Sequence, residues 1–179
     1  MSKNNKKGFT IIEVVLVLAI AGLIFLMVFI ALPALQRSQR NTQRGNDISR
    51  FLTAANDYQT NNSNKTPFAT GKLADFTIKY IDDTCTKKSE TEVENCGDQF
   101  TDPDGTQYIW AAVQDADSSK ADDQSLFTDN KYEFDHKIYV VTDAGCGSLE
   151  GTYKYYAGKN YFAMFYIEEG GSITCNDNH

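Results

Sequence analysis

One acidic residue, Glu13, lies where a basic leader meets a long apolar run. Thr10 precedes it by three positions. This Thr-x-x-Glu spacing predicts a capping box, in which the two side chains satisfy backbone N–H groups at the start of a helix. A carboxylate held in apolar surroundings also needs a cationic partner, because an unpaired buried charge is costly. The chemistry predicted here is charge pairing.

No other residues form a recognisable catalytic set. The sequence has no evident nucleophile–base pair and no phosphate-binding GxxxxGK[ST] motif. His136 lies in a predicted strand and alternates with apolar residues, so we expect it to face solvent. We therefore predict that the protein is not an enzyme and needs no cofactor.

Two acidic loops offer the oxygen ligands that Ca²⁺ prefers. One is Asp102-Pro103-Asp104-Gly105, and the other spans residues 115–123. Neither has the spacing of an EF-hand, and Pro-Asp-Gly is an ordinary turn. We predict no metal site.

The apolar run covers residues 14–32 and contains no charge in 19 positions. As a helix it is about 28 Å long, close to the thickness of a bilayer core. A soluble domain of this size has too little core to surround it. A cleaved secretory signal is the alternative, since Lys3, Lys6 and Lys7 form a basic start. The run is longer than a usual signal, however, and no A-x-A site follows it.

Four cysteines form an even set without a CxxC motif, and only two histidines accompany them. Zinc spacing is absent, so disulfides in an oxidising exterior are the better interpretation. Three pairings are open to four cysteines. Because the basic residues on the two sides of the apolar run balance, the cysteines decide the orientation, and the main part of the chain is expected outside. They are Cys85, Cys96, Cys146 and Cys175.

The 179-residue chain is acidic, with 24 Asp and Glu against 17 Lys and Arg and a net charge of −7. Residues 51–179 carry 22 acids and 10 bases. This balance argues against a nucleic-acid-binding surface. Arg37, Arg40 and Arg44 share a helical face, which we expect to be solvated or paired with an acidic neighbouring subunit.

A second helical segment is predicted to continue from the apolar run to about residue 61. Apolar residues recur at helical spacing through Ile48, Phe51, Leu52, Ala55 and Tyr58. A cluster of turn formers up to Pro67 ends it. The rest is predicted to form strands, with a hairpin turn at residues 157–160. These strands are residues 76–81, 107–113, 132–142, 152–156 and 161–167.

The string Lys6-Lys7-Gly8-Phe9-Thr10-Ile11-Ile12-Glu13, followed by this helix, resembles the class III signal of type IV pilins and pseudopilins. The resemblance covers about the first 45 residues. It implies that a prepilin peptidase cuts between Gly8 and Phe9 and methylates the new amine. The position of Pro33 in the helix resembles the position of proline in pilins of Gram-positive or candidate-phylum bacteria. The segment of Asp102 to Tyr108 is similar to the DPxG…Y segment of major pseudopilins.

The resemblance also implies an assembly mechanism. Cleavage leaves a charged amine on Phe9, and in a filament the Glu13 carboxylate of a neighbour would pair with it. Gly22 and Pro33 suggest a stretch of helix that bends or locally unwinds on assembly. For the cysteines we prefer the pairs Cys85–Cys96, which closes a charged loop, and Cys146–Cys175, as in the family's C-terminal disulfide region.

The expected fold is α+β, a long N-terminal helix packed on an antiparallel sheet with disulfide-closed loops. We predict a leader at residues 1–8, a membrane and filament-core helix at 9–33, its amphipathic half at 34–62 and a β headpiece at 63–179. We expect the precursor to be a single-pass protein of the cytoplasmic membrane, and the mature chain to be part of an extracellular pilus. Its partners would be other copies, the prepilin peptidase, the assembly platform and minor pilins.

The predicted function is that of a structural subunit, the major pilin, which adds repeatedly along a filament that serves adhesion, twitching motility or DNA uptake. A pseudopilin of a type II secretion system or a minor pilin is the alternative within the family. A membrane-anchored binding domain that never polymerises is the alternative of another class.

Overall fold

The computed structural model describes residues 8–68, 72–113, 123–126, 133–156 and 158–179. The basic leader before Gly8, most of the second acidic loop and the start of the predicted strand at residue 132 lie outside these ranges. The chain divides into two units, residues 1–39 and residues 40–179. The long helix α1 (Ile11–Asn61) contributes to both units.

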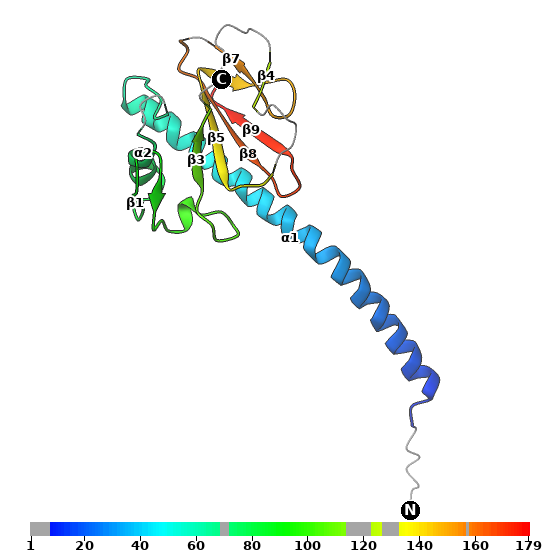
Figure 1. The fold of residues 1–179 in the computed structure, drawn as a ribbon. Coiled ribbons are helices and arrows are strands. Elements are labelled where there is room, and N and C mark those ends of the chain that lie inside the picture. Colours follow the sequence, from blue (N-terminus) through cyan, green and yellow to red (C-terminus); the bar gives the residue numbers. More distant parts are fainter. Residues whose placement is uncertain (1–7, 69–71, 114–122, 127–132, 157) are drawn as a thin grey trace, which may run out of the picture. The chain divides into compact units, whose positions relative to one another are not determined.

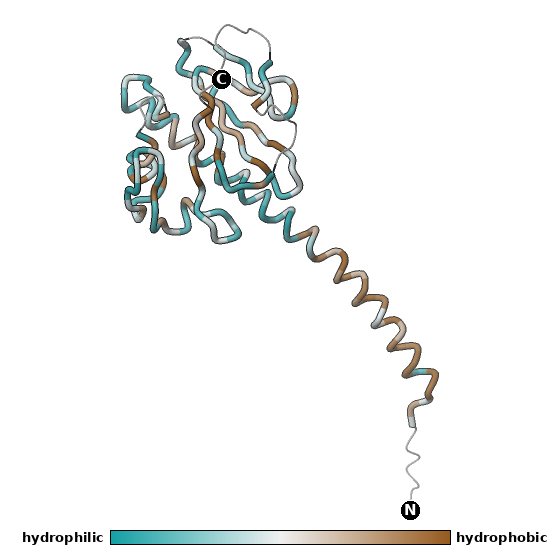
Figure 2. The backbone as a smooth tube through the Cα atoms, viewed as in Figure 1, coloured by the Kyte–Doolittle hydropathy of each residue, from teal (hydrophilic) through white to brown (hydrophobic). Residues whose placement is uncertain are grey.

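In the first unit, α1 is apolar on every side. Figure 2 shows hydrophobic residues following one another along this part of the helix almost without interruption. Its large side chains are exposed, from Ile11 at 85% to Leu35 at 58%. A helix that is apolar all round needs an apolar environment. Among the residues that the structure describes, α1 is also the one helix long and apolar enough to cross a membrane.

In the second unit, the last part of α1 packs on a four-stranded sheet with the order β3-β5-β8-β9 (Figure 1). The helical spacing predicted from the sequence is confirmed, since Ile48, Phe51 and Ala55 are fully buried. The helix ends at Asn61, as the turn formers indicate. The strands are β3 (Ile109–Ala112), β5 (Lys137–Thr142), β8 (Phe162–Ile167) and β9 (Ile173–Asp177).

Strand β8 is buried along its whole length, because both faces of the sheet are covered. Phe162, Met164 and Tyr166 belong to the core that α1 shares, whereas Ala163 and Phe165 belong to a second apolar cluster. This second cluster also contains residues of a three-stranded sheet with the order β4-β7-β6. Its strands are β4 (Gln124–Ser125), β6 (Ala144–Cys146) and β7 (Thr152–Tyr155).

The remaining elements lie between α1 and β3 in the sequence. They are the helix α2 (Leu73–Tyr80), the paired strands β1 (Thr86–Lys87) and β2 (Val93–Glu94), and the short 3₁₀ helix η1 (Asp98–Phe100). Residues 76–81 were predicted as a strand, and this prediction is wrong. Their aromatic and β-branched residues suit a strand, but Leu73, Phe76 and Thr77 recur at helical spacing and are buried on one side of α2.

Three further strand predictions need correction. β7 and β8 do not form a hairpin, because β7 pairs with β4 and β6 while β8 pairs with β5 and β9. The four-stranded sheet is mixed, since β3 and β5 run parallel. The C-terminal strand β9 is missing from the predicted strands. The α+β, pilin-like class with two disulfides is nevertheless confirmed.

Candidate processing and assembly site

The predicted cleavage position lies in non-helical chain just before α1. The backbone of Gly8 to Thr10 adopts no regular secondary structure, and the Phe9 side chain is 92% exposed. A Cβ added to Gly8 would have no neighbouring atom within 4 Å. An uncovered segment without regular secondary structure is accessible to a peptidase active site.

Thr10 and Glu13 form the predicted capping box. The Thr10 backbone N–H and the Thr10 hydroxyl both donate to Oε2 of Glu13, each at 2.8 Å. The Glu13 N–H donates in return to the Thr10 hydroxyl at 3.4 Å. The carboxylate is therefore turned back onto the helix start, and its other oxygen is left for a second partner.

Gly22 and Pro33 both lie inside α1. Proline has no N–H to donate, so the Phe29 carbonyl lacks its usual partner in the next turn. A Cβ added to Gly22 would meet open space. Neither residue ends the helix, and the bending predicted for them remains a prediction.

The fold and this helix start define a class of protein, an α+β chain of pilin-like form with an exposed apolar N-terminal helix. A family model, the prokaryotic N-terminal methylation motif, matches residues 3–29. The chain thus carries the class III signal peptide of type IV pilins at its N-terminus, and this motif supports a pilin-like or pseudopilin precursor. The motif is that of a structural subunit, and with the apolar helix it fits a membrane-anchored precursor that is later exported. No curated protein and no solved structure matches the chain.

Two of the three arginines after the apolar run, Arg40 and Arg44, pair with acids of their own chain, and not with a neighbouring subunit or with solvent alone as predicted. The Arg44 side chain is 1% exposed and donates to both carboxylate oxygens of Asp102, at 2.5 and 2.7 Å. It also donates to Glu169 at 2.9 Å and lies 4.0 Å from the centre of the Phe134 ring. Arg40 donates to both oxygens of Glu169, at 2.6 Å each.

This charge network ties the helix to the headpiece. Burial lowers the pKa of Arg44, but hydrogen bonds to Asp102 and Glu169 outweigh it, and the pKa lies above its ordinary value. Hydrogen bonds from Arg40, and then from Arg44, lower the pKa of Glu169 to about 2. Sequence reasoning missed the two carboxylates. The only available signal was the spacing of Arg40 and Arg44, which places both on one face of the helix.

His136 does not lie in a strand, contrary to the prediction. The φ angle of its backbone is 57°, outside the range of a β-strand, and β5 begins only at the next residue, Lys137. Its ring lies near Asp104, with Nε2 3.4 Å from a carboxylate oxygen, and near Asp102, with Nδ1 at 3.9 Å. Its side chain is 24% exposed, so it does not simply face solvent.

The first acidic loop is used structurally. Both oxygens of Asp102 bond Arg44, and the Asp104 N–H donates to Asp102 at 3.0 Å within a turn. Asp102, Asp104 and His136 come together in space, which the sequence does not indicate. The second loop lies almost entirely outside the described residues.

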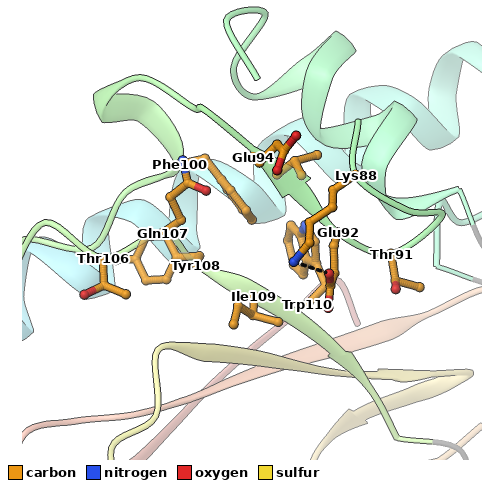
Figure 3. Close-up of a pocket in the computed structure, with 11 residues that line it drawn as sticks. Lys88, Thr91, Glu92, Glu94, Phe100, Thr106, Gln107, Tyr108, Ile109 and Trp110 are labelled. Carbon is orange, nitrogen blue, oxygen red and sulfur yellow. Dashed lines mark ion pairs between the residues drawn. The ribbon is translucent and has the colours of Figure 1, made fainter. Parts of the chain in front are cut away.

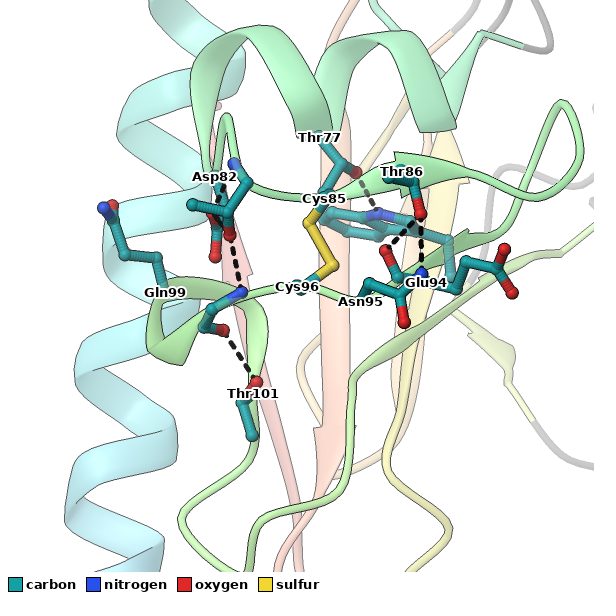
Figure 4. The surroundings of a disulfide bond; sticks show 12 residues. Thr77, Asp82, Cys85, Thr86, Glu94, Asn95, Cys96, Gln99 and Thr101 are labelled. Carbon is teal, nitrogen blue, oxygen red and sulfur yellow. Dashed lines mark hydrogen bonds between the residues drawn. A yellow bond between two sulfur atoms is a disulfide. The ribbon is translucent and has the colours of Figure 1, made fainter.

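The structure contains the disulfides Cys85–Cys96 and Cys146–Cys175, the two pairs that the sequence analysis prefers. The first closes the base of the β1–β2 hairpin (Figure 4). In the same region the Gly97 N–H donates to the Thr84 hydroxyl at 2.7 Å. The second disulfide joins β6 to β9, and thus one sheet to the other.

Proposed function

We propose that this protein is the repeating subunit of a type IV pilus. The prepilin peptidase removes residues 1–8 and methylates the amine of Phe9. The apolar helix at residues 9–33 forms the filament core, and the amphipathic half at 34–62 joins it to the headpiece at 63–179. The membrane holds the precursor, and the extracellular filament on the cell surface holds the mature chain.

The observation that carries this proposal is the position of Glu13. Its carboxylate stands at the start of a helix whose other large side chains, as far as Leu35, are apolar and exposed. When such helices leave the membrane and pack together, the carboxylate enters a region of low dielectric constant. The methylated amine of a neighbour's Phe9 is a cation of the right sign, and pairing would set the axial register between subunits.

The first experiment measures the intact mass and N-terminal sequence of protein sheared from the cell surface. We expect a chain that begins at methylated Phe9 and lacks four thiol hydrogens because of its two disulfides. A sheared chain that still carries residues 1–8 contradicts the processing step. A chain found only in the membrane fraction contradicts polymerisation and favours a membrane-anchored binding domain.

The role of Glu13 is tested by two substitutions. Glu13→Gln keeps the shape of the side chain and removes its charge, so we expect a processed protein that remains in the membrane with few or no sheared filaments. Glu13→Asp keeps the charge on a shorter side chain and serves as the matched control, with partial assembly. A normal yield of filaments from Glu13→Gln would contradict the proposed pairing of Glu13 with the Phe9 amine of a neighbouring subunit.

A pseudopilin of a secretion system is a second candidate, because the segment from Asp102 to Tyr108 resembles that of major pseudopilins. Filament yield from wild-type cells separates the two, since a major pilin is the bulk component of long sheared filaments. Other copies, the assembly platform and minor pilins are the partners expected of a pilus. Adhesion, twitching motility and DNA uptake are the activities that such a filament would serve.

A further inference from the structure

Three side chains of the kinds that bind metal ions come together in the second unit. Asp102 and Asp104 belong to the turn that precedes β3, and His136 directly precedes β5. One ligand atom from each lies within 4.8 Å of the others. Because β3 and β5 are neighbouring parallel strands, their N-terminal ends lie at the same edge of the sheet. The pairing of these strands thus brings the three residues together from distant parts of the chain.

Two of the ligand atoms are spaced like the ligands of a tetrahedral metal ion. His136 Nε2 lies 3.4 Å from Oδ2 of Asp104. This distance is longer than the usual N–H···O hydrogen bond of about 2.7–3.2 Å. Zinc binds imidazole nitrogen and carboxylate oxygen at about 2.0–2.2 Å, so two such ligands at a tetrahedral angle are roughly 3.4 Å apart. The two atoms therefore have the separation that a zinc ion between them requires.

Asp102 is not available as a ligand, but its charge acts on His136. Arg44 bonds both carboxylate oxygens of Asp102, and the Asp104 N–H bonds Oδ1 as well. Oδ1 lies 3.9 Å from His136 Nδ1, which is buried and has no hydrogen-bond partner among the described residues. A carboxylate on this side of the ring favours the tautomer with its proton on Nδ1. The lone pair of Nε2 is then free for a metal ion.

Both ligands are held by contacts that a bound ion would leave intact. Oδ1 of Asp104 accepts from the Thr106 N–H at 2.9 Å, while Oδ2 is the oxygen near His136. The Phe134 ring packs at a steep angle against the His136 ring, with ring centres 4.4 Å apart. The side chains of Asp104 and His136 are 32% and 24% exposed, so water can reach the space between them.

The charge around this pair also suits a cation. Arg40 and Arg44 carry two positive charges, and the neighbouring carboxylates of Asp102, Asp104 and Glu169 carry three negative ones. With a neutral His136 the group has one negative charge in excess. A nitrogen ligand beside a carboxylate suits Zn²⁺, Cu²⁺ or Ni²⁺, whereas Ca²⁺ and Mg²⁺ prefer oxygen ligands alone.

We propose that His136 and Asp104 bind a divalent transition-metal ion, and that Zn²⁺ is one that fits. His136 Nε2 and Asp104 Oδ2 would supply two ligands, and water would complete the tetrahedral coordination. Asp102 would be a positioning residue that orients the His136 ring. The site belongs wholly to the second unit, so the proposal does not rest on filament assembly.

The site is separate from a cavity of about 330 Å³ between the β1–β2 hairpin and β3. Figure 3 shows that cavity, with Thr106 and Trp110 among the residues that line it. Neither Asp104 nor His136 lines it. The proposed ion would therefore be held at the surface of the headpiece.

The binding test is isothermal titration calorimetry of the full-length protein in detergent. The protein carries no histidine tag, is treated with a chelator and is then dialysed. ZnCl₂ and CaCl₂ are titrated separately at the same ionic strength. We expect a saturable heat for one Zn²⁺ per chain and none for Ca²⁺. Cu²⁺ should bind more tightly than Zn²⁺, because it forms stronger complexes with the same donors.

Two variants remove the ligands one at a time. His136→Asn removes the imidazole, and asparagine tolerates the φ of 57° at this position. Asp104→Asn removes the charge and keeps a residue that suits a turn. Loss of even an outer-shell partner weakens metal binding about 10–100-fold, so we expect the dissociation constant for Zn²⁺ to rise about tenfold or more. His179→Asn is the matched control, because His179 is the other histidine of the chain and is exposed. Its dissociation constant should equal that of the unmodified protein.

The proposal is overturned if Zn²⁺ gives no saturable heat or if Ca²⁺ binds as tightly as Zn²⁺. Equal weakening by His179→Asn and His136→Asn would overturn it as well, since the heat would then come from histidines in general. Urea unfolding of each metal-free variant reports whether the headpiece is folded. If His136→Asn does not fold, Asp104→Asn decides the question, and an unchanged dissociation constant for Zn²⁺ in that variant contradicts the site.

Discussion

Glu13 and Arg44 represent two ways in which this chain carries a charge among apolar residues. Among the described residues, Glu13 bonds its own helix start through Thr10, and one carboxylate oxygen remains open to a new partner. Arg44 is enclosed by Asp102, Glu169 and the Phe134 ring, and its hydrogen bonds are made within its own chain. The first arrangement suits a contact between chains, and the second suits stability within one chain.

Removing the Arg44 guanidinium should destabilise the headpiece strongly. Arg44→Met leaves the buried Asp102 carboxylate without its cation, and breaking one side of a buried ion pair costs about 3–5 kcal/mol. Urea unfolding followed by Trp110 fluorescence measures this loss. Arg37→Met, at an exposed position of the same helix, is the control and should change the free energy of unfolding by less than about 0.5 kcal/mol. Similar stability of both variants would contradict a structural role for the network.

Glu169 should make stability depend on acid. Its pKa is about 2 in the folded chain and 4.5 ordinarily, so the folded state favours the ionised carboxylate. The stabilisation is present above pH 4.5 and is lost as the pH falls toward 2. Glu169→Gln should flatten the fall in unfolding free energy in this window and lower stability at neutral pH. If the free energy of unfolding of Glu169→Gln fell between pH 4.5 and 2 as steeply as that of the unmodified protein, the acid sensitivity would come from other carboxylates.

At the scale of elements, β8 is the centre of the headpiece. Its alternate residues face two different apolar clusters, one shared with α1 and one with the three-stranded sheet. Gly45 of α1 allows this close packing, because an added Cβ would lie 3.1 Å from the Tyr166 hydroxyl oxygen. The Cys146–Cys175 bond then joins the two sheets at β6 and β9.

The two disulfides should contribute unequally to stability. They join residues separated by 11 and 29 positions, and the loss of chain entropy on cross-linking grows with loop length. Replacing Cys146 and Cys175 by serine should cost about 1 kcal/mol more than replacing Cys85 and Cys96, within a total of about 2–4 kcal/mol each. Denaturant titration of the two double variants measures the difference. A larger loss of stability from replacing Cys85 and Cys96 would show that this disulfide stabilises the fold by more than its loop length indicates.

At the scale of the whole molecule, charge and hydrophobicity are separated along the chain. The apolar residues are concentrated in the first unit, and the acids are concentrated after residue 50. This division suits a precursor that rests in a membrane and exposes an acidic headpiece outside it. An excess of one charge on the headpieces also keeps them soluble.

The proposed processing should shift the isoelectric point. Removal of residues 1–8 takes away Lys3, Lys6 and Lys7, which lowers the count of Lys and Arg from 17 to 14 against 24 acids and changes the net charge from −7 to −10. The precursor has an isoelectric point of about 4.8. Isoelectric focusing of sheared and membrane fractions should show the sheared form at a lower value. Identical positions of the two forms would contradict the removal of the leader.

The structure of the N-terminal part of this protein was predictable from its amino-acid sequence. The capping box, the apolar helix and the buried positions of α1 follow from contacts between residues three or four positions apart, and such contacts are visible in a linear pattern. The motif at residues 3–29 has the same local character. The α+β class also followed from pattern, because helical and alternating spacings differ clearly.

The contacts between distant segments could not be predicted in this way and are seen in the folded chain. The partners of Arg44 lie 58 and 125 positions away, and β8 pairs with β5 and β9 and not with β7, the strand directly before it in the chain. Residues 76–81 have strand propensity and form a helix, because one side of α2 is buried in the core. The cavity beside Trp110 depends on a hairpin placed against β3. These features are set by packing between distant segments, which local propensity and spacing do not encode.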